Sequence, residues 1–203
     1  MPLISLYTGA RGNELCQLKL CDIKEEQDIH YFHFNAAQLN PNGDKVGKTK
    51  AAKRRTTVHS MLIKLGFLNY VTQQKSAGET MLFSGLKWDK KNGYWAQGSK
   101  WFDKYLIGCG VKDRTKDKNK LCHHSFRHTL KHHLKEKNVR IDWANHVVGH
   151  TNGSDYDDHE INIKLLSEEV IEKIDFGLDF SHLMNSRKNP YFSAGNDVTA
   201  AFP

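Results

Sequence analysis

The chain has 203 residues, 38% of them hydrophobic, and its 30 lysines and arginines outnumber 23 acidic residues to give a formal net charge of +7. No apolar run approaches the ~20 residues of a membrane-spanning helix, which excludes an integral membrane protein. Ten phenylalanines, seven tyrosines and four tryptophans exclude a wholly disordered chain. A folded domain with excess positive charge is a candidate for nucleic-acid binding.

The N-terminal third predicts short helices followed by a small sheet. Apolar residues recur at helical spacing over Pro2–Asp22, with an interruption at Thr8-Gly9. Turn-forming residues at 40–44 predict a reversal of the chain between two paired strands. Three strands are expected to form an antiparallel sheet: Ile29–Phe34, Lys45–Lys50 and Arg54–His59.

The remaining two thirds read as mainly helical. Helical periodicity returns at Ser60, and Gly85–Gly98 is expected to be an ordered loop. Later helices are expected at Ser99–Gly108, Ser125–Lys137, Ile141–Val148 and Ser167–Ile174. The predicted fold class is therefore α+β, mainly helical with a small three-stranded antiparallel sheet. Residues 1–183 are expected to form one domain and 184–203 a C-terminal tail.

The cysteines predict a reducing environment and no structural metal. Cysteines 16, 21, 109 and 122 form no CxxC pair and no dense framework, so free thiols are expected. No secretory signal is visible at the N-terminus. Three histidines, at positions 124, 128 and 132, recur at i, i+4 spacing, which leaves a zinc site as an alternative interpretation.

Two segments place basic residues where an anion could bind. In the first, Thr8–Leu18, a glycine turn brings Arg11 to the start of a helix, where an anion is favoured. In the second, Val46–Arg55, Lys48 lies near the tip of a basic hairpin. The alternatives are a surface arginine and a solvated hairpin. The GKT tripeptide at 47–49 is not a P-loop, because the upstream glycine of that motif is replaced by Asn42.

Two further segments add histidines. His124 and Arg127 are three residues apart at a predicted helix start, a spacing that suits a phosphate, since arginine offers paired donors and histidine exchanges protons near neutral pH. His150 follows a glycine after an apolar helix, which could be a simple helix cap. Tyr156 lies shortly beyond and is a candidate nucleophile for phosphoryl chemistry. Alone it would be read as a surface aromatic.

The order of these segments is more specific than any one of them. The series TGxRxxELxxL from Thr8, the hairpin KT at Lys48, HxxR at His124 and VGH ending at His150 resembles the catalytic domain of the tyrosine recombinases, or phage integrases. The similarity is to integrases of prophages and genomic islands. Family members carry further N-terminal domains, so the chain is expected to be part of a longer protein.

The resemblance implies a mechanism of DNA strand cleavage and rejoining through a 3′-phosphotyrosyl intermediate. It implies that Arg11 and Arg127 clamp the scissile phosphate and that Lys48 protonates the leaving 5′-oxygen. His124 is implied in proton transfer from the nucleophile, and His150 in a hydrogen bond to the phosphate. This chemistry requires charge stabilisation and a general acid, and it needs no metal or other cofactor.

The nucleophile is the open point of the resemblance. The family's tyrosine usually follows the GH histidine by nine residues, and that position is His159 here. Tyr156 is the favoured nucleophile, about one helical turn earlier. Tyr191 in the tail is a second possibility. The alternative function is a catalytically degenerate integrase-like protein that binds DNA without cleaving it.

The resemblance also implies the partners. Glu14 is expected to orient one of the two clamping arginines without contacting the phosphate itself. DNA phosphates are expected to contact a basic group made up of Lys45, Lys50, Lys53, Arg54 and Arg55. The expected partners are double-stranded attachment sites and three further copies of the chain, as a tetramer on DNA and a monomer alone. The expected location is the cytoplasm of a bacterial host.

Overall fold

The fold is described from a computed structural model, covering residues 1–35, 53–113, 121–150 and 161–184. The helices in these ranges are α1 (Pro2–Thr8), α2 (Gly12–Cys16), α3 (Ser60–Lys64), α4 (Phe67–Ser76), α5 (Trp95–Gly108), α6 (Ser125–Glu136), α7 (Ile141–Val148), α8 (Ile163–Leu166) and α9 (Ser181–Met184). The strands are β1 (Ile23–Glu26), β2 (Ile29–Phe34) and β3 (Arg54–Thr57), in the order β1-β2-β3. The predicted α+β class, with a three-stranded antiparallel sheet, is confirmed.

One strand of the sheet differs from the prediction. One edge strand is β1, which is joined to β2 by a tight turn in which Gln27 and Asp28 both have positive φ, at 53° and 61°. Sequence reasoning missed β1 because Ile23 is its one buried residue and the other three are charged and exposed. The expected strand at Lys45–Lys50 lies outside the described residues.

The expected loop at Gly85–Gly98 is shorter than predicted, because α5 begins at Trp95. The backbone N–H of Trp95 donates to Oδ1 of Asn13, 2.9 Å away. A Cβ on Gly12 would lie 2.2 Å from the Trp95 ring, so only glycine allows this approach. The start of α5 is therefore set by contacts with α2, which the local sequence pattern does not reveal.

Two other elements have bounds that differ from the predicted ones. β3 ends at Thr57 rather than His59, because the His59 ring accepts a hydrogen bond from the Met61 N–H and caps α3. The last predicted long helix begins earlier, at Ile163, because Asn162 caps the start of α8. Its continuation, Ser167–Ile171, is a π-helical turn.

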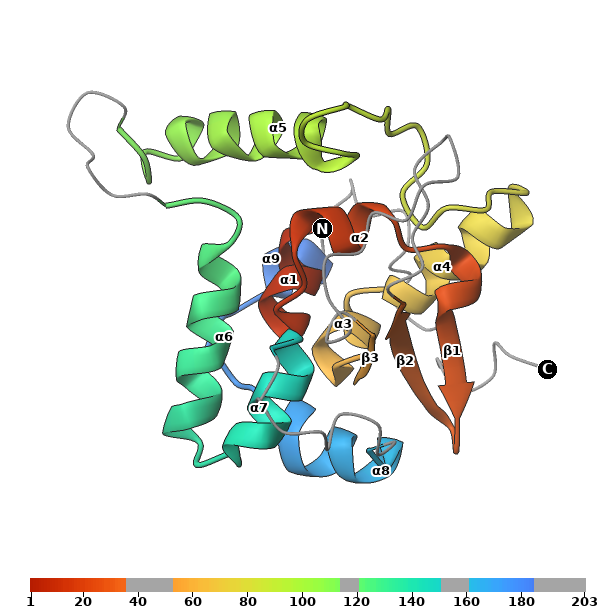
Figure 1. Ribbon diagram of the computed structural model, residues 1–203, viewed down its shortest axis with the longest axis vertical. Helices are drawn as coiled ribbons and strands as arrows, with labels where there is room; N and C mark the ends of the chain where they lie inside the picture. The colour runs from red at the N-terminus through yellow and green to blue at the C-terminus, as the bar shows by residue number, and fades with distance from the viewer. Residues whose placement is uncertain (36–52, 114–120, 151–160, 185–203) are drawn as a thin grey trace.

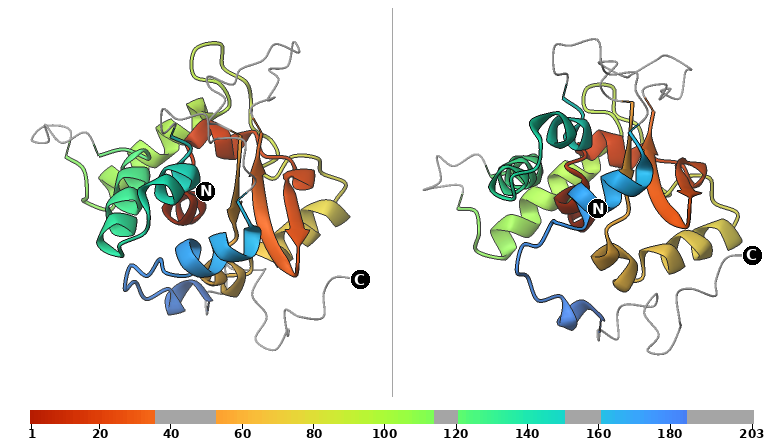
Figure 2. Two further views of the ribbon diagram at one scale, coloured as in Figure 1. Left: turned by 60° about the horizontal axis from the view of Figure 1, so that its bottom comes forward. Right: turned by 90° about the horizontal axis from the view of Figure 1, so that it is seen from below.

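The sheet lies on one side of α1, and the α6–α7 pair lies on the other (Figures 1 and 2). α5 crosses above α2 at the top of Figure 1. Gly9, at φ +62°, ends α1; a Cβ there would lie 2.9 Å from Val148 Cγ1 and 3.2 Å from Leu130 Cδ2. The end of α1 therefore packs directly against α6 and α7. Fully buried side chains include Phe32, Phe34, Leu130, Leu134, Val147 and Val148.

All four cysteines are free thiols. Cys16 is completely buried, and burial raises its pKa to about 12, while Cys21, Cys109 and Cys122 are exposed. Within the described ranges, no helix combines the length and apolar character needed to cross a membrane.

Candidate active site

Arg127 is held between two glycine turns. Its Nη1 donates to the Gly9 carbonyl at 2.9 Å and its Nη2 to the Gly149 carbonyl at 3.3 Å. Both glycines have positive φ and follow the last residue of a helix, α1 and α7 respectively. Arg127 is 3% exposed, and its buried Nε has no hydrogen-bond partner among the described residues. A buried donor in this state is suited to an incoming acceptor.

Arg11 lies at the start of α2 beside Glu14. The Glu14 carboxylate accepts from the Arg11 backbone N–H at 2.9 Å and from Arg11 Nη1 at 2.6 Å. The same carboxylate accepts from Arg54 Nη2 at 2.9 Å. Burial opposes the ionisation of Glu14, but the charge of Arg54 and the hydrogen bonds from both arginines outweigh it and lower its pKa to about 2. Glu14 therefore stays ionised and orients Arg11, whose side chain is 42% exposed.

The structure corrects the expectation that Arg54 contacts DNA. Its side chain is 1% exposed, its guanidinium lies 4.1 Å from the centre of the Phe34 ring, and its Nε donates to the Val147 carbonyl at 2.9 Å. An arginine enclosed in this way presents nothing to a DNA phosphate at the surface. It joins β3, α2 and α7, and through Glu14 it supports Arg11.

Lys53 and Arg55, the neighbours of Arg54 in the predicted basic group, are less buried than Arg54 and differ from each other in their contacts. Lys53 is exposed, as a phosphate contact requires. Arg55 is partly buried and pairs with Glu26 at 2.9 Å, while its Nη2 donates to the Ile161 carbonyl at 2.8 Å. Its contacts tie the sheet to the start of the α8 segment.

His124 and His150 both lie exposed beside these arginines. Partial desolvation, followed by the charges of Arg127 and Lys131, lowers the pKa of His150 to about 4. Desolvation, then His128 and Arg127, lowers the pKa of His124. Desolvation, then the charges of Arg11 and Arg54, lowers the pKa of Arg127 to about 10. These shifts show that the groups are close enough to repel one another when charged.

Lys131 is a member of this cluster that sequence reasoning missed. Its Nζ lies 3.3 Å from His150 Nδ1. An ammonium has only donors, so Nδ1 accepts and the proton of neutral His150 resides on Nε2. The signal was available in the sequence, because Lys131 follows Arg127 by four residues and helical residues at that spacing share a face.

Replacement of Lys131 by alanine is expected to raise the pKa of His150 above about 4, because a repelling charge is removed, while burial and Arg127, the two larger causes, keep it below 6.5. Titration of the His150 ring by NMR in the DNA-free protein measures this shift. Lys131→Arg keeps the charge and should keep the low pKa. Lys135→Ala, one turn further along α6, is the matched control. An unchanged pKa in Lys131→Ala would contradict the assignment.

Several predicted site residues lie outside the described ranges. These are Lys45, Lys48, Lys50 and the candidate nucleophiles Tyr156 and Tyr191. The structure brings together Arg11, Glu14, His124, Arg127 and His150, and it does not test the five residues outside the described ranges. In the part of the chain that is described, no three His, Cys, Asp or Glu side chains are grouped as metal ligands.

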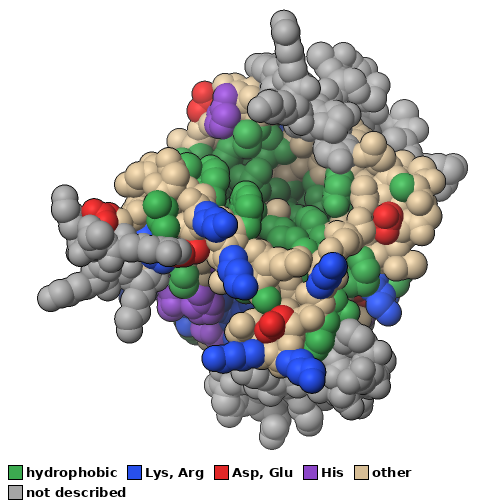
Figure 3. Space-filling view, turned by 90° about the horizontal axis from the view of Figure 1, so that it is seen from above, with side chains coloured by type: hydrophobic (Ala, Val, Ile, Leu, Met, Phe, Trp, Pro, Cys, Tyr) green, Lys and Arg blue, Asp and Glu red, His purple; other side chains and the backbone are tan. Residues whose placement is uncertain are grey.

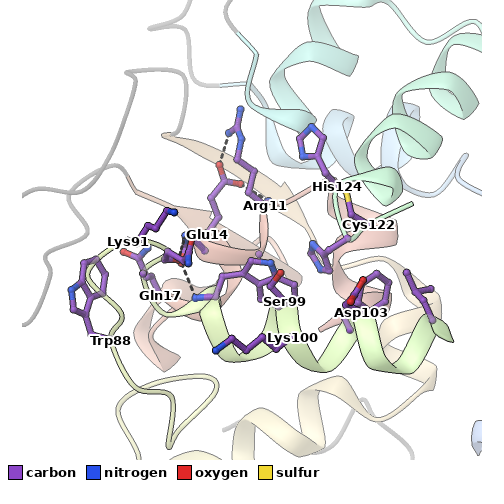
Figure 4. A pocket seen from close by; sticks show the side chains of 18 of the residues that line it. Arg11, Glu14, Gln17, Trp88, Lys91, Ser99, Lys100, Asp103, Cys122 and His124 are labelled. Carbon is purple, nitrogen blue, oxygen red and sulfur yellow. Dashed lines mark hydrogen bonds and ion pairs between the residues drawn. The ribbon is translucent and has the colours of Figure 1, made fainter. Parts of the chain in front are cut away.

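A pocket of about 950 Å³ opens beside Arg11 and His124. Figure 4 shows it between α5 and two residues at α2, Glu14 within the helix and Gln17 just after it, with Trp88 at one end. Seen from above, a hollow lined with hydrophobic side chains adjoins a group of Lys and Arg side chains (Figure 3). The pocket lining itself combines positive charge, from Lys91 and Lys100 beside Arg11, with aromatic side chains such as Trp88, Trp95 and Phe102.

The described part of the chain is an α+β domain in which two arginines and two histidines converge at one site. A family model described as the phage integrase family matches residues 1–157. The chain therefore belongs to the phage integrase family, the tyrosine recombinases, whose general function is site-specific DNA recombination. Neither a curated protein nor a solved structure matches the chain significantly.

Proposed function

We propose that the chain cleaves and rejoins DNA at specific sites through a 3′-phosphotyrosyl intermediate. The observation that supports this most strongly is the convergence of Arg11, His124, Arg127, Lys131 and His150 on one place. Burial and the nearby positive charges lower the pKa values of three of them, His124, Arg127 and His150. Groups that repel one another in this way are stabilised by a shared anion. A DNA phosphodiester, which gains negative charge in the transition state, is the anion that the family membership indicates.

The two arginines have different parts in this proposal. Arg127 is fixed by the Gly9 and Gly149 carbonyls, and its buried Nε–H has no partner among the described residues, so it is a donor that a phosphate oxygen could satisfy once admitted to the site. Arg11 is held by Glu14 on one side and is exposed on the other. His150 donates from Nε2, because Lys131 occupies Nδ1. Such fixed donors act mainly in the transition state, where they lower the barrier.

In the proposed covalent step, one bond to phosphorus forms as another breaks. The hydroxyl oxygen of Tyr156 attacks phosphorus, the bond from phosphorus to the 5′-oxygen breaks, and the strand end is held as a 3′-phosphotyrosine. Lys48 supplies the proton to the leaving 5′-oxygen, and His124 takes part in removing the tyrosine proton. Attack by a 5′-hydroxyl on the phosphotyrosine reverses these changes, so the bond energy is conserved.

The test uses a nicked suicide DNA duplex that carries the attachment site of this recombinase. Incubated with the full-length protein, it is expected to give a protein–DNA adduct that survives SDS, because the released 5′ fragment diffuses away. The adduct should disappear in Tyr156→Phe, which lacks the attacking oxygen. Tyr191→Phe is the matched control and should leave the adduct unchanged.

Other outcomes reassign the function. An adduct that persists in Tyr156→Phe and disappears in Tyr191→Phe would move the nucleophile to the tail. Absence of an adduct in every variant, with DNA binding intact, would favour the degenerate DNA-binding protein, in line with His159 at the usual tyrosine position. The domain boundary after residue 183, the tetramer on DNA and the bacterial host remain predictions.

A further inference from the structure

The pocket beside Arg11 and His124 is lined by several parts of the chain that are far apart in the sequence. The start of α2 forms one wall, α5 forms the opposite wall, and the segment 88–93 closes one end. Arg11 and His124 both line the pocket, so it continues directly from the group to which the scissile phosphate is assigned. In Figure 4, Trp88 lies at the end away from His124. A ligand bound here would be contiguous with that phosphate.

The inner wall of the pocket is preformed. The Trp95 ring packs on the backbone of Gly12 and lies 4.4 Å from the His123 ring, measured between centroids. His123 is in turn hydrogen-bonded to the buried hydroxyl of Ser5 at 2.8 Å. Burial is the main cause that lowers the pKa of His123 to about 4, so this imidazole is neutral and adds no charge. The wall therefore needs no rearrangement to receive a planar group.

The lining suits a nucleotide. Trp88 is half-buried and offers an aromatic surface for stacking, and Lys91 and Lys100 supply exposed positive charge. Gln17 is 9% exposed, and its Oε1 has no hydrogen-bond partner among the described residues. An unpartnered amide oxygen in such a place is suited to the exocyclic amino group of a base.

We propose that this pocket binds an unpaired nucleotide of the DNA strand whose phosphate is held at Arg11 and Arg127. The inference rests on the proposed function, since that assigns the phosphate. Bases inside a duplex are stacked and cannot enter a pocket, so the nucleotide must have left the stack. The buried Gln17 oxygen favours a base that bears an amino group, such as cytosine, over thymine.

Two single-stranded probes of equal length, oligo-dC and oligo-dT, together with a duplex of the same length, test the proposal. Fluorescence anisotropy at one fixed salt concentration measures the affinity of each. Trp88→Ala is expected to weaken binding of both single strands by about tenfold, as loss of one stacked base does, and to leave duplex binding unchanged. Trp101→Ala is the matched control, because Trp101 is 52% exposed on α5 and does not line the pocket.

The choice of base is tested separately. Wild-type protein is expected to prefer oligo-dC over oligo-dT by about fivefold, the effect of one added hydrogen bond. Gln17→Leu should remove this preference, while Gln97→Leu, at an exposed position of α5 outside the pocket, should retain it. Thermal melting of each variant confirms that it is folded.

Binding equilibria do not require a nucleophile, so these results are independent of the adduct assay. Equal loss of single-stranded and duplex binding in Trp88→Ala would overturn the pocket assignment, and so would no loss at all. A dC preference that survives in Gln17→Leu would overturn the role of Gln17. Absence of all DNA binding in the wild type would instead contradict the proposed function.

Discussion

Arg127→Lys is expected to reduce adduct formation by on the order of a thousandfold, while the protein remains folded and binds DNA. Arg127 donates to the Gly9 and Gly149 carbonyls, and its Nε–H has no partner among the described residues, which leaves it for the phosphate in the proposed function. A lysine carries the charge but lacks the planar fork, so it cannot hold both carbonyls and the phosphate together. Loss of one fixed donor in such a site costs about 10²–10³ in rate.

The measurement is the single-turnover rate of adduct formation on the nicked duplex. Arg140→Lys is the control, because Arg140 is exposed at the start of α7 and pairs with Asp142. Duplex affinity and the melting temperature separate a catalytic defect from misfolding. A rate within tenfold of wild type would show that Arg127 does not contact the phosphate.

Glu14→Gln is expected to lower the free energy of unfolding at neutral pH by about 3–5 kcal/mol, because it leaves the buried Arg54 charge without its counter-ion. The pKa of Glu14 is lowered from 4.5 to about 2 in the folded protein. A lowered pKa means that the stabilisation is fully present above pH 4.5 and is lost as the pH falls toward 2. The shift corresponds to about 3 kcal/mol.

Urea unfolding across this pH range tests the expectation. Wild type and Glu14→Gln should differ most near neutral pH and converge as the pH approaches 2. Glu26→Gln, which breaks the more exposed pair with Arg55, is the control and should cost less than about 1 kcal/mol. A constant difference between wild type and Glu14→Gln at every pH would contradict the assignment of the low pKa to Glu14.

Elements with a strong local pattern were predictable from the sequence. The predicted α7 has the observed bounds, Ile141–Val148, because its apolar spacing is regular and Gly149 ends it. β1 could not be predicted, since three of its four residues are charged and exposed, and the contact of Glu26 with Arg55 is non-local. The early start of α5 also depends on tertiary contacts.

The candidate site likewise contains residues that could be predicted from the sequence and residues that could not. Arg11, His124, Arg127 and His150 could be singled out because glycines and fixed spacings surround them in the sequence. Arg54 could not be separated from its basic neighbours, since only the tertiary structure places it between Glu14 and the Phe34 ring. A run of basic residues therefore predicts a charged face but does not tell which side chain turns inward.

The four thiols divide into two classes of chemical reactivity. A thiolate is the reactive form, so Cys16, completely buried and with a pKa of about 12, is inert toward alkylating reagents while the domain is folded. Cys21, Cys109 and Cys122 remain open to modification, and Cys122 lines the pocket next to His124. An alkylating label at Cys122 would therefore report occupancy of the pocket, whereas modification of Cys16 would report opening of the whole core.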